Sequence, residues 1–244
     1  MIRYLSLIMI FATLLGAETP VIPTMNFELS APNTPQQLVS SLNVLVILTL
    51  LVLAPSLVLV MTTFTRFVIV FGFLRQALGT QQVPPNQLLV MLAMILTFFV
   101  MEPIGVQAYE EGIKPYIAEE IGYEEAFEKA TIPFKNFMIR NTREKDLALF
   151  FRIRGMQNPQ TIAEVPLSVV IPAFVISELK TAFEIGFLIF LPFLVIDMVV
   201  ASILMSMGMM MLPPVMISLP FKILIFVLID GWNLLIGNLI ASIK

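Results

Sequence analysis

The segment Met205-Ser206-Met207-Gly208-Met209-Met210-Met211-Leu212-Pro213-Pro214 decides how this chain folds. It lies in a stretch without formal charge that runs from Met198 to Phe221. A turn between two helices is normally polar, whereas this one is apolar and rich in sulfur. Methionine has three rotatable bonds and a soft thioether, so it fills irregular gaps and repacks when a gap changes shape. The segment therefore predicts a helical hairpin whose turn is either a deformable seal or ordinary methionine packing, and composition alone favours packing.

The rest of the chain has the composition of an integral membrane protein. Of its 244 residues, 58% are hydrophobic and only 13% are charged, and the mean hydropathy is +0.94. Soluble domains contain about 25% charged residues, and a soluble protein this apolar would expose large aggregating patches. We therefore expect an all-α membrane protein. The net charge of −3 gives no indication of a nucleic-acid partner.

Several kinds of chemistry are excluded by composition. The chain has no Cys and no His, which removes disulfides, thiol nucleophiles and histidine–metal sites. It also lacks the Gly-x-x-x-x-Gly-Lys loop that binds nucleotide phosphates. Asp197 and Asp230 do not lie in a Gly-rich motif that would shape a paired-carboxylate protease site. We therefore expect no enzyme activity and no cofactor.

The N-terminus resembles a secretory signal. Arg3 is followed by an apolar stretch over residues 5–15 and then by Gly16-Ala17, small residues of the kind found at signal-peptide cleavage sites. We expect residues 1–17 to be a signal peptide cleaved after Ala17. An uncleaved anchor helix is the alternative, although about ten apolar residues are too few to cross ~30 Å of hydrocarbon. Residues 18–37 contain four prolines and are interpreted as a linker.

Two apolar regions flank a polar one. Residues 38–108 predict a first helical pair, with a span over 39–62 kinked at Pro55, a short segment over 64–78 and a span over 85–106. Residues 166–244 predict a second hairpin, with apolar elements over 182–207 and 215–243. Because proline lacks an N–H donor, the prolines of this region are expected to break its helices into pieces: Pro166, Pro172, Pro192, Pro213, Pro214 and Pro220.

Residues 109–165 predict a water-soluble helical insert. The insert begins acidic and then turns basic, and its apolar residues recur at helical spacing. The opposite charges are either a solvated face or a means of docking neighbouring copies. Lys and Arg favour the cytoplasmic side of short loops, so Arg66 and Arg75 place the first connection inside and the insert in the periplasm.

Charged residues within the apolar regions are the remaining candidates for function. A charge at the centre of a spanning helix costs about 2.5–3.5 kcal/mol on insertion scales, so such residues face a bundle interior or an aqueous path. Asp197, Glu178 and Lys222 are the residues of this kind that we single out. Either they form ion pairs between helices or they line a pathway, and the sequence leaves both open.

Many segments of the chain resemble the FliP family of flagellar export proteins, called SctR in virulence-type secretion. They occur in one order along residues 45–240. They include Phe64-Thr65-Arg66-Phe67, Arg75-Gln76-Ala77-Leu78-Gly79-Thr80-Gln81, Phe137-Met138-Ile139-Arg140-Asn141-Thr142-Arg143-Glu144-Lys145-Asp146-Leu147, Ser177-Glu178-Leu179-Lys180, Leu219-Pro220-Phe221-Lys222 and Asp230-Gly231-Trp232.

The resemblance implies a pore-forming subunit of the export gate of a type III secretion apparatus. About five copies would join FliQ and FliR in a closed helical ring, with FlhA and FlhB as further partners, in the bacterial inner membrane at the flagellar basal body and largely facing the periplasm. Unfolded flagellar subunits would pass through it. Met209, Met210 and Met211 would form a gasket, and Arg143 would make a charge-assisted contact with an acidic group. The four apolar elements, over 39–62, 85–106, 182–207 and 215–243, would be buried against neighbouring subunits rather than against lipid.

Two other interpretations remain from the residues. A small-solute or ion-coupled transporter would use Asp197 and Lys222 as coupling charges, but such transporters commonly contain internal repeats, and residues 39–106 do not resemble 182–243. The second is a purely structural membrane scaffold. A closed ring of identical copies would favour the gate over both.

Overall fold

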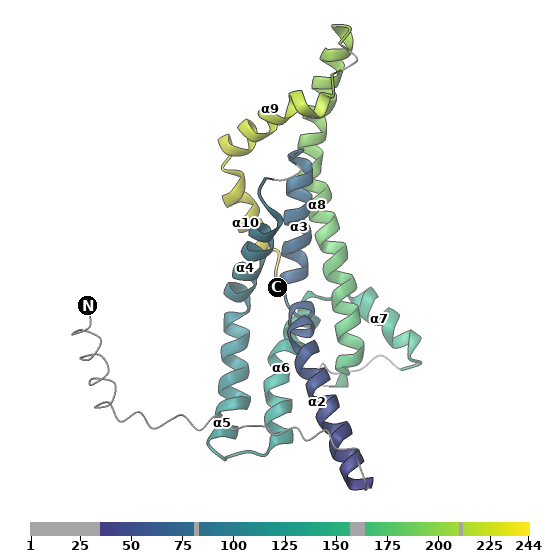
Figure 1. Cartoon of the computed structure of the whole chain (residues 1–244), viewed down its shortest axis with the longest axis vertical. Coiled ribbons are helices and arrows are strands. Elements are labelled where there is room, and N and C mark those ends of the chain that lie inside the picture. Colours follow the sequence, from purple (N-terminus) through teal and green to yellow (C-terminus); the bar gives the residue numbers. More distant parts are fainter. Residues whose placement is uncertain (1–34, 81–82, 157–163, 210–211) are drawn as a thin grey trace, which may run out of the picture. The chain divides into compact units, whose positions relative to one another are not determined.

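A computed structural model describes residues 35–80, 83–156, 164–209 and 212–244. Within these ranges the chain is helical and contains no strand, which confirms the all-α prediction (Figure 1). The helices are α2 (Pro35–Val60), α3 (Phe64–Ala77), α4 (Asn86–Ala108), the π-helix η1 (Tyr109–Ile113), α5 (Lys114–Ile117), α6 (Tyr123–Asn141), α7 (Glu144–Ile153), α8 (Leu167–Ser206), α9 (Pro214–Leu228) and α10 (Gly231–Ala241). The predicted signal peptide lies outside the described residues.

The chain divides into two compact units, residues 1–50 and 51–244, with the boundary inside α2. Helix α2 contains Pro55 and covers most of the span predicted over 39–62. Its first three residues belong to the segment that the sequence assigned to the linker. The core and the sites described below belong to the second unit.

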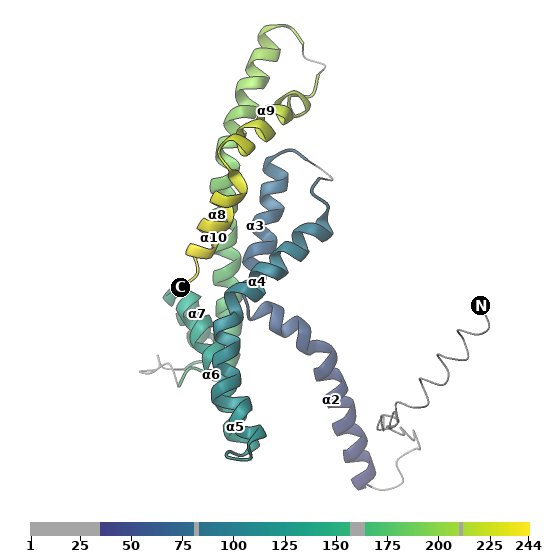
Figure 2. The ribbon, with the colours of Figure 1, turned by 90° about the vertical axis from the view of Figure 1, so that its left-hand side faces the viewer.

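Helix α3 is the centre of the second unit. It lies between α4 and α8, as Figures 1 and 2 both show. Phe67, Phe71 and Leu74 on α3 are buried in a core shared with α8, α9 and α10. Helix α8 approaches closely because residue 186 is glycine: a Cβ there would lie 2.4 Å from the Phe73 ring. The segment that the sequence predicted as a short connection is therefore a core helix.

Helix α8 is continuous over 40 residues and contains Pro172 and Pro192, and α9 contains Pro220. The prediction that these three prolines break the helices was wrong. Apolar surroundings offer no water to satisfy freed backbone groups, so the rest of the helical ladder is retained around each proline. At 1.5 Å per residue α8 is ~60 Å long, about twice the thickness of a bilayer core.

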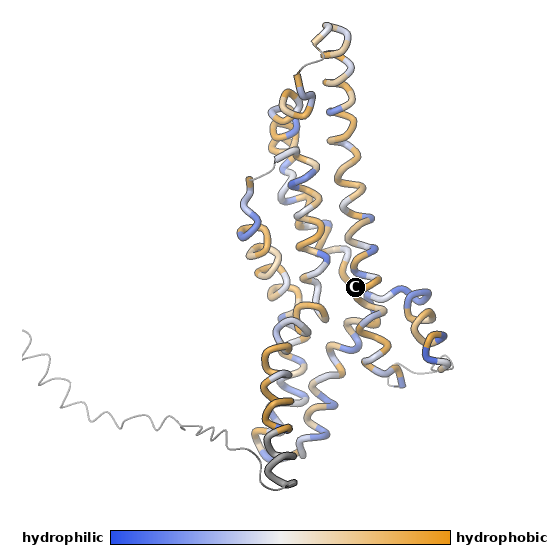
Figure 3. Tube along the Cα trace, turned by 45° about the vertical axis from the view of Figure 1, so that its right-hand side comes forward, coloured by the Kyte–Doolittle hydropathy of each residue, from blue (hydrophilic) through white to orange (hydrophobic). Residues whose placement is uncertain are grey.

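In the part of the chain that the structure describes, two helices are long and apolar enough to cross a membrane by length and composition: Asn86–Ile117 and Leu167–Ser206. A third candidate is the pair α9 and α10, which is bent by 65°. Asp230, with φ of 52°, occupies the bend, and a Cβ on Gly231 would lie 2.3 Å from the Phe226 ring. The apolar element predicted over 215–243 is therefore present as a broken span. Figure 3 shows the apolar character of α8 and α9.

Glycine, rather than proline, ends α8 at the methionine-rich turn. Gly208 has φ of +75°, its N–H donates to Met205 O, and the N–H of Met209 donates to Leu204 O. These two hydrogen bonds form a Schellman motif, which satisfies the last carbonyls of a helix. Pro214 then begins α9 at a position where a missing N–H costs nothing.

The polar insert is helical, as predicted. The helix of α4 continues through η1 into α5 as far as Ile117, so residue 109 is not a break in the chain's path. Phe137 and Met138 of α6 and Phe151 of α7 are buried against Val170 and Phe174 of α8. The amphipathic spacing read from the sequence thus predicted the faces that α6 and α7 bury.

Candidate functional site

Asp197 of α8 and Lys222 of α9 form an ion pair just below the methionine-rich turn. Lys222 Nζ lies 2.6 Å from Asp197 Oδ2 and donates a second hydrogen bond, 3.0 Å long, to the carbonyl oxygen of Ala77 at the end of α3. Ser218 donates to the other carboxylate oxygen of Asp197. Lys222 is 2% exposed. The sequence left an ion pair between helices as one of two alternatives for these charges. The structure joins Asp197 and Lys222 in such a pair, and Lys222 also connects it to the end of α3.

Glu178 of α8 pairs with Arg66 of α3 in the core of the bundle. Arg66 Nε donates to Glu178 Oε2 at 2.8 Å, and Arg66 Nη2 donates to Oε1. Arg66 Nη1 also donates to the carbonyl and hydroxyl oxygens of Ser242. Both charged side chains are almost fully buried. Arg66 is therefore not a loop charge of the kind that sets membrane orientation, because its charge is neutralised inside the bundle by a residue 112 positions away.

We expect Glu178→Ala to destabilise the fold strongly. The guanidinium of Arg66 would remain buried without its carboxylate, and breaking a buried pair in this way costs about 3–5 kcal/mol. The measurement is the thermal unfolding of the detergent-solubilised chain, together with its amount in membranes. The double variant Arg66→Met, Glu178→Leu is the control, because removing both charges is often neutral. Equal losses of stability in the two variants would show that side-chain packing at this site, and not the charge of the pair, determines the stability.

Arg143 caps the start of α7 and finds its acidic partner within the same chain. Its Nε donates to Asp146 Oδ2 at 2.7 Å, and its backbone N–H donates to Ser177 Oγ of α8. Ser177 Oγ donates to the same carboxylate at 2.6 Å. Burial alone would raise the pKa of Asp146, but the hydrogen bonds from Ser177 and Arg143 and the Arg143 charge hold that pKa below its usual value. Asp146 therefore ties α7 to α8 as a carboxylate.

The methionine-rich turn exposes its apolar side chains. Met205, Met207 and Met209 are 60%, 65% and 36% exposed, and Leu212 and Met216 beyond the turn are also exposed. Met210 and Met211 lie outside the described residues. The turn is at the upper end of α8 in Figure 1. Below it, a 470 Å³ groove between α8 and α9 is lined only by apolar residues, among them Val199 and Phe221. The tip of this hairpin is therefore a soft hydrophobic surface.

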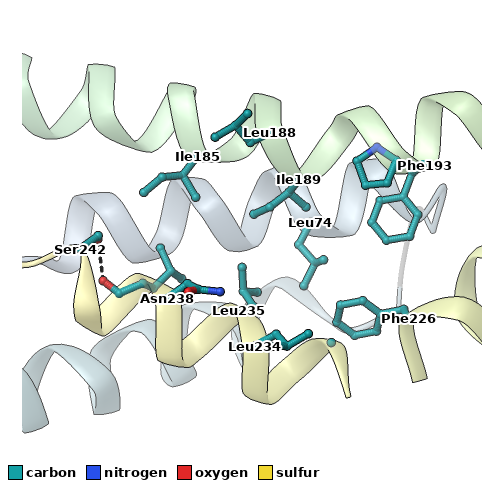
Figure 4. A pocket seen from close by; sticks show the side chains of 13 residues that line it. Leu74, Ile185, Leu188, Ile189, Phe193, Phe226, Leu234, Leu235, Asn238 and Ser242 are labelled. Atoms are coloured by element: carbon teal, nitrogen blue, oxygen red, sulfur yellow. Dashed lines mark hydrogen bonds between the residues drawn. The ribbon is translucent and has the colours of Figure 1, made fainter. Parts of the chain in front are cut away.

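A second apolar cavity, of 410 Å³, lies between α8, α3 and the bent pair (Figure 4). Phe193, Phe226 and Leu235 are among its lining residues, and Asn238 and Ser242 supply its polar groups. No charged side chain lines it, so it offers no group for acid–base chemistry. Across the described ranges, no three His, Cys, Asp or Glu residues gather as a metal site would require.

Long apolar helices, a broken span and buried ion pairs between helices define this chain as a helical membrane protein whose hairpin tip is apolar. Comparison with known proteins identifies the family to which this membrane protein belongs. The model of the FliP family matches residues 47–239. The flagellar biosynthetic protein FliP of Bacillus subtilis (strain 168) is 54% identical over 208 residues, 85% of this chain and 94% of the relative.

Two further relatives give the same result. The flagellar biosynthetic protein FliP of Aquifex aeolicus (strain VF5) is 50% identical, over 84% of this chain and 87% of the relative. That of Treponema pallidum (strain Nichols) is 45% identical, over 93% of this chain and 86% of the relative. The chain belongs to the FliP family of flagellar biosynthetic proteins. This membership also places it among export components and not among enzymes.

Proposed function

We propose that this chain is the pore-forming core subunit of the flagellar type III protein export gate and passes unfolded flagellar subunits across the inner membrane. The observation that carries the proposal is the exposed, sulfur-rich tip of the α8–α9 hairpin. In an isolated subunit this exposed apolar surface would have no protein partner, and such surfaces mark interaction sites. Tips from several copies would bury it against one another.

The physical properties of the tip suit this role. An unfolded protein presents every kind of side chain in turn, so a wall that lets it pass must adapt and must not be specific. Flexible methionine-rich surfaces repack around different partners. We propose Met209, Met210 and Met211 as the gasket that closes the pore at rest.

The partners follow from the same proposal. About five copies would assemble with FliQ and FliR, in contact with the export proteins FlhA and FlhB, in the flagellar basal body and largely on the periplasmic side. The outward faces of α8 and α9 support assembly, because large apolar residues such as Phe183, Phe187 and Val227 are exposed along them. Neighbouring subunits and lipid would cover these faces.

The test is the number of copies in the complex purified in detergent without crosslinking. Native mass measurement is expected to give several copies of this chain, about five, in one closed complex. A complex with one or two copies would contradict a ring and would favour the transporter, for which the Asp197–Lys222 pair would supply coupling charges.

A further inference from the structure

Three neighbouring aromatic rings are exposed on the insert, one pair edge to face and one pair stacked, away from both apolar cores. The ring centroids of Tyr116 and Tyr123 are 6.4 Å apart, and those of Tyr123 and Phe127 are 6.3 Å apart. These side chains are 47%, 69% and 57% exposed. We call these three residues the aromatic patch. Tyrosine is enriched among the residues that contribute most to protein interfaces, so the patch is a candidate contact surface.

Charge restricts what that partner can be. Five exposed glutamates surround the aromatic patch along the chain, and Glu125 among them pairs with Lys129: Glu119, Glu120, Glu124, Glu125 and Glu128. An acidic rim of this kind repels anionic lipid headgroups, which attract lysine and arginine instead. It favours a protein surface that carries arginine and lysine, which also interact favourably with ring faces.

The same chain carries such a surface at the other end of α6. Arg140, Arg143 and Lys145 line a 750 Å³ pocket at the junction of α6 and α7, which we call the basic pocket. Arg140 and Lys145 are exposed. The neighbouring Lys180 ammonium lowers the pKa of Lys145, which shows that positive charge is crowded here. Five basic side chains but only one acidic side chain, Glu144, line the pocket, so it keeps an excess of positive charge although Arg143 is engaged by Asp146.

One chain cannot join these two surfaces. Sixteen residues of helix separate Glu124 from Arg140, which is ~24 Å at 1.5 Å per residue. Complementary surfaces at different places on one chain make head-to-tail contacts, which propagate into rings or helical assemblies.

We propose that the aromatic patch of one copy docks on the basic pocket of the next copy and forms the insert's contact between subunits. This inference deepens the proposed function and rests on its several-copy assembly. Tyr123 and Phe127 enter the pocket region, and the glutamates of the rim pair with Arg140 and Lys145. If the assembly is open rather than closed, one of its ends exposes an unpaired aromatic patch and the other end exposes an unpaired basic pocket.

The natural absence of cysteine allows a direct test. The full-length chain with Glu124→Cys and Arg140→Cys is expressed in membranes and oxidised. A disulfide requires Cα atoms within about 7 Å, so the two cysteines of one chain cannot pair across ~24 Å of helix. We expect a ladder of dimers, trimers and larger species that reductant removes, whereas each single variant gives no ladder. The matched control pairs Glu124→Cys with Arg152→Cys, an exposed position of α7 that does not line the pocket.

A second measurement does not depend on disulfide geometry. Reversal of one side (Glu120→Lys with Glu124→Lys) or of the other (Arg140→Glu with Lys145→Glu) is expected to weaken assembly at least about tenfold, equivalent to about 1.4 kcal/mol. The chain with all four reversals should recover. Failure of that chain to recover, or a control pair that crosslinks as well as the test pair, would overturn the proposed contact. A several-copy complex without a ladder would overturn the contact and leave the proposed function standing.

Discussion

Replacement of Lys222 by Glu is expected to abolish flagellar export and to lower the amount of folded chain in membranes. The new carboxylate would lie next to Asp197 and would face the carbonyl oxygen of Ala77, where Lys222 now donates to both. Loss of one partner of a buried pair costs about 3–5 kcal/mol, and two adjacent buried carboxylates cost more. Lys222→Arg retains the positive charge and is expected to keep part of the export. The measurements are the amounts of secreted flagellin and of membrane-bound chain, in cells that carry no unmutated copy of this protein.

A double variant separates a structural pair from a pathway. Asp197→Leu with Lys222→Met removes both charges and keeps similar volumes, so a structural clamp would tolerate it. We expect this variant to accumulate and to export. Normal accumulation without export would show that the charges act on the passing substrate or on ions. Equal defects in Lys222→Glu and Lys222→Arg would show that the sign of the charge is irrelevant.

The apolar helices could be predicted because their signal is local. Length and hydropathy indicated the spans, and helical spacing of Phe137, Met138 and Phe151 indicated the buried faces of the insert. The continuity of α8 through Pro172 and Pro192 could not be predicted. A proline breaks a helix when water can satisfy the freed groups, and the sequence does not show whether water is present.

The ion pairs could be predicted only in part from the sequence. Asp197, Glu178 and Lys222 stood out because each lies in an apolar stretch. Arg66 was misassigned, because a single arginine near a predicted span resembles a loop charge until its partner is known. Its contact with Glu178 depends on how α3 packs between α4 and α8, and no local pattern encodes that packing.

Removal of the methionine side chains at 209, 210 and 211 is expected to open a leak. Truncation to Ala takes away most of the volume that can seal a pore, while export needs only an opening. Gly208 ends α8 and Pro214 begins α9, so these three positions lie between the two helices. Secretion is therefore expected to persist in part. A matched control loses three other exposed methionines, by Met91→Ala, Met94→Ala and Met198→Ala.

The permeability of the membrane to ions and small metabolites tests the central claim most directly. It is measured in cells that carry the triple variant Met209→Ala, Met210→Ala, Met211→Ala in an assembled complex, beside the parent and the control. The gasket predicts efflux of small solutes in the triple variant alone. Permeability at the parental level, with the complex assembled, would show that these methionines are ordinary packing and would contradict the gate.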